Sequence, residues 1–233
     1  MNLFYQPAIQ QGVHHLDPTE SKHCTKVLRK KGGDKIYITD GKGFLYEALI
    51  TRADPGECQF EIHETKAETE KSFSIHIAIS ATKHADRLEW FVEKAVELGV
   101  DRITIMMCEH TEHSHFKIDR LEKIAISAMK QSLRLKLPPV DGPIAFKDLV
   151  NEAEASSKFI AYVDAKNPEH LKKVAQPHSN YVVLVGPEGD FSRSEIELAM
   201  TKNFRKVSLG SNRLRTETAG LAACHILNLV NIA

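Results

Sequence analysis

The sequence predicts an α/β protein with two domains: a small β-barrel over residues 1–70 and a larger, mainly parallel sheet over residues 71–233. Alternating strand patterns fill the first part, whereas apolar strands alternate with amphipathic helices in the second. Hydrophobic residues make up 42% of the chain and charged residues 27%, as in ordinary globular proteins. No apolar run approaches the ~18 residues needed to span a bilayer, and residues 1–7 lack the basic start of a secretory signal. We therefore expect a cytoplasmic protein that does not bind membranes.

The first domain is predicted to hold one short helix among several strands. The strand candidates are residues 34–40, 44–51 and 58–65, separated by turn signals. Asp17 is the expected N-cap of the helix, with Pro18 at its first position, and the helix is expected to end near Leu28. The polar stretch from Glu64 to Ser72 is interpreted as the linker.

The second domain is predicted to be an open sheet with helices on both faces. Gly99 is expected to stop its first helix, and Ser192 with Glu195 forms a capping-box pattern that opens a later one. The expected strands are residues 73–79, 102–107, 158–163, 181–185 and 204–209. In such sheets ligands bind beyond the carboxyl ends of the strands, in the loops that lead into helices.

Charge is balanced overall but uneven along the chain. The 31 basic and 31 acidic residues cancel, which gives no support to a protein that coats nucleic acid nonspecifically. Residues 22–35 nevertheless carry six basic residues against one acidic, and residues 202–215 carry five with no acid. Residues 117–136 add six basic residues against two acidic. Three such clusters favour a polyanionic partner.

The cysteines and histidines do not predict a metal site. The four cysteines include no Cys-x-x-Cys pair, so neither a zinc ribbon nor a disulfide framework is indicated. His110, His113 and His115 have a spacing that could bind a metal, but no fourth ligand is evident and the segment is typical of a polar loop.

Two loops that follow predicted strands stand out. Residues 184–192 contain Gly186 and Gly189, which allow a ligand to approach the backbone closely, and a helix N-terminus follows. Residues 209–219 lead into the last helix, for which Thr216 is the expected N-cap. Glu217 suits the positive end of that helix, but Arg215 carries the opposite charge there, which indicates an anionic or electron-rich ligand nearby.

Several motifs together resemble one known family. They are Gly186-Pro187-Glu188-Gly189, Leu209-Gly210, Leu214-Arg215-Thr216-Glu217-Thr218-Ala219, Lys26-Val27-Leu28-Arg29, Leu88-Glu89-Trp90, the run from Glu93 to Gly99, and Gln131-Ser132-Leu133-Arg134. Over nearly the whole chain, their order and spacing resemble the RsmE family of ribosomal RNA uracil-N3 methyltransferases. The resemblance implies a PUA-like N-terminal barrel and a SPOUT-type domain whose C-terminal chain threads into a trefoil knot. It also implies S-adenosyl-L-methionine as cofactor, a homodimer, and methylation of a uridine of 16S ribosomal RNA near the decoding centre.

Site residues follow from the resemblance together with the chemistry of uracil. Arg215 is expected to stabilise the uracil anion, and Glu217 or Glu188 to orient it or accept the N3 proton. The cofactor-binding candidates are Leu184, Gly186, Pro187, Glu188, Gly189, Leu209, Gly210, Leu214, Thr216 and Thr218. The RNA-contact candidates are Lys26, Arg29, Lys30, Lys83, Arg87 and Arg134. No metal is expected, because a sulfonium is already an activated methyl donor.

The sequence departs from the family pattern at two places. Asp190 stands where many relatives have a second glycine, so it is a poor candidate for an obligatory base. Ser211-Asn212 stand where proline or other residues are often found.

Two alternatives stay open. One is a non-enzymatic RNA-binding or ribosome-assembly factor, in which the barrel binds RNA and the large domain is a scaffold. The other is a nucleotide-binding α/β enzyme that uses Gly186–Gly189 as an anion cradle. Binding of the methyl donor distinguishes both from a methyltransferase.

Overall fold

The structure, a computed structural model, describes residues 2–112, 116–162 and 169–232. The chain divides into two compact units. The first comprises residues 1–70 together with residues 126–137, and the second comprises residues 71–125 and 138–233. The segment 126–137 therefore belongs to the first unit. The boundary expected from the sequence, between residues 70 and 71, places this segment in the second domain.

The first unit is built on a four-stranded sheet in the order β1-β2-β3-β4, where a small barrel was expected. Strand β1 runs parallel to β2, and the remaining neighbours are antiparallel. The strands are β1 (Leu3–Tyr5), β2 (Lys35–Thr39), β3 (Phe44–Arg52) and β4 (Gln59–Ala67). Because β4 pairs with β3 as far as Ala67, the beginning of the expected linker is part of this strand.

The predicted helix of the first unit is confirmed. It consists of α1 (Pro18–Lys22), which continues as a turn of π-helix, η2 (His23–Val27); a short 3-10 helix, η1 (Ile9–Gln11), precedes it. Asp17 caps it, since its Oδ1 accepts hydrogen bonds from the N–H groups of Thr19 (2.7 Å) and Glu20 (2.9 Å). The helix contributes the buried Cys24 to a core with Phe4, Ile38 and other apolar residues of the sheet.

Within the first unit, polar contacts join residues 126–137 to residues 1–70. The buried carboxylate of Glu20 forms an ion pair with Lys130, and the Thr39 hydroxyl donates to the carbonyl of Leu135 (3.0 Å). Because Glu20 is withdrawn from water, its lysine partner offsets a charge that would otherwise be costly to bury.

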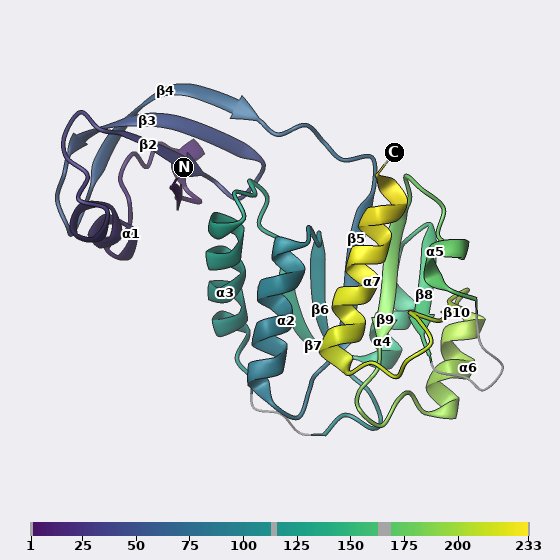
Figure 1. Ribbon diagram of the computed structural model, residues 1–233. Helices are drawn as coiled ribbons and strands as arrows, with labels where there is room; N and C mark the ends of the chain where they lie inside the picture. The colour runs from purple at the N-terminus through teal and green to yellow at the C-terminus, as the bar shows by residue number, and fades with distance from the viewer. Residues whose placement is uncertain (1, 113–115, 163–168, 233) are drawn as a thin grey trace. The chain divides into compact units, whose positions relative to one another are not determined.

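The second unit contains a six-stranded sheet in which every neighbouring pair is parallel, as predicted (Figure 1). The strand order is β10-β8-β9-β5-β6-β7. The strands are β5 (Ser74–Ser80), β6 (Arg102–Met107), β7 (Val140–Ala145), β8 (Ser157–Ala161), β9 (Asn180–Val185) and β10 (Arg205–Val207).

Helices accompany this sheet. They are α2 (Ala85–Glu97), the first part of α3 (Ile118–Gln131), α4 (Phe146–Glu152), α5 (Leu171–Val174), α6 (Arg193–Thr201) and α7 (Thr216–Asn231); from residue 126 on, α3 belongs to the first unit. Helix α7 packs against α2 and over β5 and β9 (Figure 1), whereas α4 packs with α6 and against β6 and β7. The predicted ends of two helices are confirmed: Gly99, in a left-handed conformation, directly follows Leu98, the C-cap of α2, and Ser192 and Glu195 form the capping box of α6. None of the described helices is long and apolar enough to cross a membrane.

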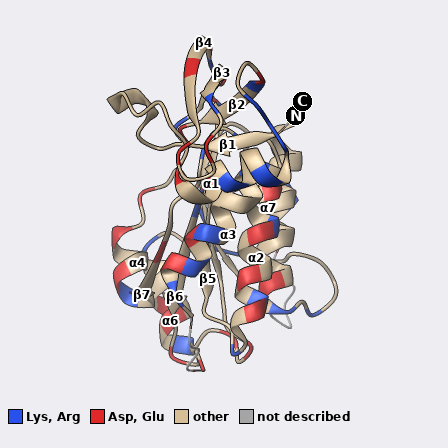
Figure 2. Ribbon diagram, turned by 90° about the vertical axis from the view of Figure 1, so that its left-hand side faces the viewer, with Lys and Arg blue, Asp and Glu red and all other residues tan. Residues whose placement is uncertain are grey.

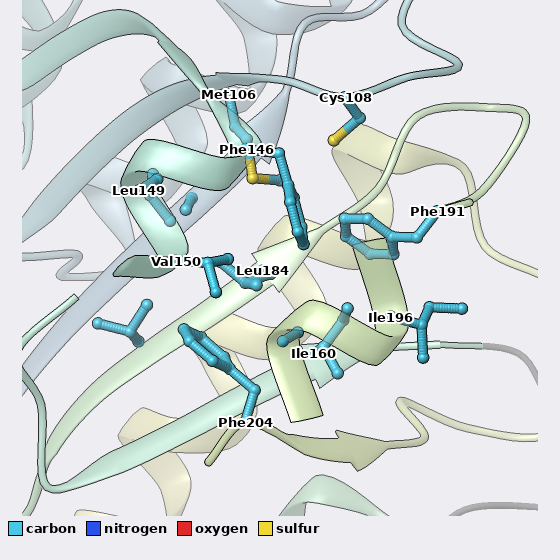
Figure 3. Packing of buried hydrophobic residues seen from close by; sticks show 13 residues of the cluster. Met106, Cys108, Phe146, Leu149, Val150, Ile160, Leu184, Phe191, Ile196 and Phe204 are labelled. Carbon is cyan, nitrogen blue, oxygen red and sulfur yellow. The ribbon is translucent and has the colours of Figure 1, made fainter. Parts of the chain in front are cut away.

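The core under α4 and α6 is aromatic at its centre (Figure 3). The rings of Phe146 and Phe191 lie 5.5 Å apart between centroids, and Phe204 and Leu184 are also buried in this cluster. Phe191 belongs to the loop after β9, so the core fixes the position of that loop. The outer faces of α2 and α3 instead carry interspersed basic and acidic positions (Figure 2), among them Arg120, whose Nη2 donates to Glu89 (2.7 Å).

Strand β7 was not predicted, because Gly142 and Pro143 interrupt its pattern. Proline is tolerated here since β7 is an edge strand. Gly142 has a φ of +120°, and a Cβ built on it would lie 2.4 Å from the backbone oxygen of Ile105 in the neighbouring strand. Only glycine therefore fits at this position.

We predict that Gly142→Ala destabilises the protein by about 2–4 kcal/mol, because the new methyl group meets backbone atoms and the φ angle is unfavourable for alanine. Urea unfolding of both proteins measures the difference. Gly32→Ala is the matched control, since a Cβ there would lie 3.8 Å from its nearest neighbour, and its change should stay within about 0.5 kcal/mol. Equal stabilities of the two variants would contradict this packing.

Candidate active site

A cavity of about 520 Å³ lies at the carboxyl ends of β8, β9 and β10. The last residues of these strands, Ala161, Val185 and Val207, all line it. Its remaining walls come mainly from the two loops singled out in the sequence, residues 186–190 and 208–215, which the parallel sheet brings together. The volume is typical of a small-molecule site.

The first loop is held by tight packing around Gly186. A Cβ built on Gly186 would lie 3.0 Å from the ring of Phe191, which is itself buried in the core. The loop closes with a hydrogen bond from the N–H of Asp190 to the carbonyl of Pro187 (2.9 Å). The guanidinium of Arg213 donates to the carbonyl of Glu188 (3.2 Å), so the second loop also contacts the first.

The start of α7 differs from the prediction, and the difference matters for the cavity. Arg215, not Thr216, is the N-cap, and its side chain makes no capping hydrogen bond. The hydroxyl of Thr216 instead donates to the carbonyl of Gly186 (3.0 Å), which joins the last helix to the first loop. Since the first N–H groups of a helix have no intrahelical acceptor, the beginning of α7 presents donors that suit an anionic ligand group.

Charged side chains of both signs line the cavity. The cations are Arg87, Arg213 and Arg215, and the acids are Glu188 and Asp190. Glu188 Oε1 accepts a hydrogen bond from the N–H of Lys83 (3.4 Å) and lies 4.0 Å from Arg87 Nη1. Arg87, which the sequence suggested as an RNA contact, is thus part of the cavity wall.

Most of the predicted cofactor residues meet at this cavity. Those that line it are Gly186, Pro187, Glu188, Leu209, Gly210, Leu214 and Thr216, and the predicted catalytic residue Arg215 lies among them. Leu184 is buried beneath the loop, Gly189 packs on His110, and Thr218 is exposed; their ligand contacts stay predictions.

Glu217 is buried outside this lining. The residue is 6% exposed, and no hydrogen-bond partner of its Oε2 is found among the residues that the structure describes. Its predicted part in proton transfer therefore has no direct contact with the cavity to support it.

Asp190 is the cavity residue that the sequence argument set aside. It is half-buried and has a φ of +62°, which is uncommon for a residue other than glycine. Burial raises the pKa of its carboxyl, while the N–H of Phe191, Arg213 and His110 oppose that rise. No local sequence pattern predicts the positive φ of Asp190.

The predicted RNA contacts are divided between the two units. Lys26, Arg29, Lys30 and Arg134 belong to the first, whereas Lys83 and Arg87 belong to the second. The ammonium of Lys83 is engaged with Glu112 (2.9 Å). Of the histidines considered as metal ligands, His110 bonds through Nδ1 to the carbonyl of Asp190 (3.0 Å), and His113 and His115 lie outside the described residues.

The parallel α/β sheet with its cavity of glycine-bearing loops and the N-terminal sheet each match a known domain family of RNA methyltransferases. The RNA methyltransferase domain family matches residues 69–228, and the RNA methyltransferase PUA domain family matches residues 16–62. The chain belongs to the family of the ribosomal RNA small subunit methyltransferase E.

Relatives cover the chain from end to end. A protein of that name from Aquifex aeolicus is 29% identical over 97% of this chain and 99% of its own. A probable rRNA-methyltransferase from Porphyromonas gingivalis has a crystal structure that is 39% identical, with a TM-score of 0.94 over 99% of this chain and 98% of its own. The ribosomal RNA small subunit methyltransferase E of Neisseria gonorrhoeae, solved bound to S-adenosyl methionine, is 28% identical, with a TM-score of 0.85 and the same coverage of 99% and 98%.

We predict that Thr216→Val removes the hydrogen bond between the two loops and lowers the free energy of unfolding by about 1–3 kcal/mol, because the partly buried carbonyl of Gly186 loses its donor. Thr218→Val is the matched control, since Thr218 is exposed on the same turn, and it should change stability little. Chemical denaturation of the three proteins makes the comparison, and a Thr216→Val protein as stable as the wild type would show that the bond is dispensable.

Proposed function

We propose that this protein transfers a methyl group from S-adenosyl-L-methionine to N3 of a specific uridine in 16S ribosomal RNA, near the decoding centre. The observation that carries the proposal is the cavity that the loops 186–190 and 208–215 form together in a chain of this family. The Neisseria gonorrhoeae relative binds S-adenosyl methionine, which supports the same cofactor here. As a ribosomal RNA enzyme, it would act in the cytoplasm during ribosome biogenesis.

The residues of the cavity fit this cofactor. Gly210 has a φ of +146°, and a Cβ there would meet nothing within 4 Å, so the backbone is open at this wall. The N–H groups at the start of α7, together with Arg215, suit the carboxylate of a methionine group. Apolar walls from Pro187, Leu209 and Leu214 suit an adenosine ring. When bound, S-adenosyl-L-methionine supplies a methyl group that its sulfonium already activates.

The protein must supply the rest of the chemistry. Uracil N3 carries a proton and has no free lone pair until that proton leaves, so the anion that forms needs stabilisation on O2 or O4. Arg215 is exposed at the cavity wall and not used as a helix cap, which leaves its guanidinium available to the anion. Holding N3 in line with the methyl group is the remaining task of the loops.

Two partners complete the proposal. The basic residues Lys26, Arg29, Lys30 and Arg134, with Lys83, are proposed to contact RNA phosphates and so to position the substrate. A second copy of the chain is proposed to pack on α7, whose outward side carries Leu229 at 46% exposure, followed by Ile232 at 70%. No metal is proposed.

The function is tested by mass spectrometry of 16S ribosomal RNA from cells with and without the gene. N3-methyluridine present only in cells with the gene, and restored by adding the purified protein to RNA or subunits from the deletion, is the expected result. A retained modification in the deletion strain would refute the proposed reaction. A protein that binds RNA but not the methyl donor would be the assembly factor considered above.

The cofactor site predicts the effect of Gly186→Val. The branched side chain would meet the ring of Phe191, which the core prevents from moving away, and displace the first loop. We expect the affinity for S-adenosylhomocysteine to fall at least about tenfold by calorimetry. Gly32→Val serves as the control, because a Cβ at Gly32 would make only ordinary van der Waals contacts, and unchanged affinity in a folded Gly186→Val protein would count against this cavity.

Arg215 and Arg29 are predicted to separate chemistry from RNA binding. Arg215→Ala should raise the activation free energy of single-turnover methylation by about 2–4 kcal/mol, while cofactor affinity changes little. Arg29→Ala should weaken RNA binding and reduce its salt dependence by roughly one phosphate contact, with the rate at saturating RNA nearly intact. An Arg215→Ala enzyme with a normal rate and poor RNA affinity would make Arg215 a phosphate contact.

The proposed dimer predicts a mass near twice 26.2 kDa by light scattering at micromolar concentration. Leu229→Arg should give a monomer, because a charge is costly to bury in an apolar interface. Met200→Arg, at a comparably exposed position on α6, is the control. A wild-type protein that stays at the mass of one chain would exclude the dimer.

A further inference from the structure

The proposed reaction needs a proton acceptor in the cavity, and the described lining offers two carboxylates, Glu188 and Asp190. The three arginines that share the lining cannot accept a proton, because their guanidinium groups are permanently protonated. Glu217 is buried outside the lining. The choice of acceptor therefore lies between the two acids of the first loop.

Glu188 is the more exposed of the two acids, and its side-chain contacts involve a cation and a backbone N–H of the wall. Its Oε1 accepts the N–H of Lys83 at 3.4 Å and faces Arg87 at 4.0 Å, and its own carbonyl accepts from Arg213. These contacts hold the carboxylate of Glu188 against the wall of the cavity. They suit a residue that orients the wall of the cavity better than one that accepts a proton.

Asp190 has one oxygen held and one available. The N–H of Phe191 donates to Oδ1 at 2.8 Å, and within the part of the chain that the structure describes no donor is bound to Oδ2. The carboxyl is half-buried, and this burial raises its pKa and makes it a stronger base than an exposed aspartate.

The backbone of Asp190 is fixed in an uncommon conformation from two sides. Its N–H donates to the carbonyl of Pro187 at 2.9 Å, and its own carbonyl accepts from Nδ1 of His110 at 3.0 Å. These bonds hold the φ of +62°, which is uncommon outside glycine but which aspartate and asparagine both adopt more readily than other residues. Residues in such conformations cluster at functional sites.

We infer that Asp190 accepts the N3 proton of the target uridine, an assignment that rests on the proposed methyltransferase function. The N3–H bond breaks and a new O–H bond forms on Oδ2, while the electron pair stays on N3 and spreads to O2 and O4. That pair then forms the bond to the methyl carbon, and the pair of the broken carbon–sulfur bond remains on the sulfur of S-adenosyl-L-methionine. Arg215 faces the charge that builds up on the uracil oxygens.

The groups around Asp190 determine the pH dependence. Arg213 faces it from the second loop and His110 from the segment after β6, and both favour the ionised carboxylate when charged. Glu188 and Arg87 share the cavity wall. With the acceptor present, the rate should rise with pH until Asp190 is ionised and then level off.

The experiment compares wild type with Asp190→Asn in single-turnover methylation of small ribosomal subunits from a deletion strain, at saturating S-adenosyl-L-methionine, over pH 6 to 9.5. Asparagine keeps an oxygen for the N–H of Phe191 and tolerates a positive φ, so the loop should persist. At pH 7 we expect a rate at least about 100-fold lower. The rate of the variant should then rise about tenfold per pH unit and approach the wild-type rate, because hydroxide replaces the missing base.

Three controls make the result decisive. Asp190→Gly removes the carboxyl without any backbone strain and should show the same pH profile, which protects the test against misfolding of the first variant. Glu197→Gln, an exposed acid on α6 paired with Arg193, should behave as wild type. Calorimetric affinity of both Asp190 variants for S-adenosylhomocysteine should stay within about threefold of wild type.

Two outcomes would overturn the assignment. Variants with the wild-type pH profile and rate would show that Asp190 accepts no proton. Variants that lose cofactor affinity but keep the saturated rate would make Asp190 a cofactor contact. If the wild-type protein itself forms no N3-methyluridine, the proposed function fails first, and the two failures are thus distinguishable.

Discussion

The hydrogen bond from the Thr216 hydroxyl to the Gly186 carbonyl joins the two parts of the chain on which the site depends. It links the first residue of the last helix to the first loop residue after β9. Each loop alone is an ordinary strand-to-helix connection. Because the strands are parallel, their carboxyl ends meet at one edge of the sheet, and this bond fixes the distance between the loops that follow. The start of α7, with its free N–H groups and Arg215, is thereby placed in the cavity wall.

The use of Thr216 in this bond explains the electrostatics of the site. A threonine at the N-cap would have satisfied an N–H group of the helix, but here its hydroxyl is directed to another loop. The helix start therefore keeps its positive character for a ligand. Glu188 and Asp190 are acids in the wall of the same cavity. One ligand can therefore place an anionic group at the start of α7 and a cationic group near these acids.

Sequence patterns predicted the layers, the parallel sheet and both site loops, because each of these follows from local periodicity and from the rule that parallel strands end together. They failed where a contact between residues distant in the sequence determines the local structure. The pattern of β7 is broken by Gly142 and Pro143, which only an edge position beside Ile105 explains. Capping preferences favoured Thr216 as N-cap, but its hydroxyl donates to the carbonyl of Gly186, thirty residues earlier in the chain. The conformation of Asp190 depends on His110, eighty residues earlier in the chain, and no local signal records it.

The segment 126–137 gives the chain an order of assembly. The ribosome releases the strands of the first unit early, yet Glu20 must wait for Lys130, and Thr39 for Leu135, before their bonds can form. By then β5, α2 and β6 of the second unit have also been synthesised. The small N-terminal unit is consequently completed only when more than half of the protein exists. A chain cut at residue 70 would lack the ion pair of Glu20 with Lys130 and the bond of Thr39 to Leu135, so residues 1–70 do not contain all the contacts of this unit.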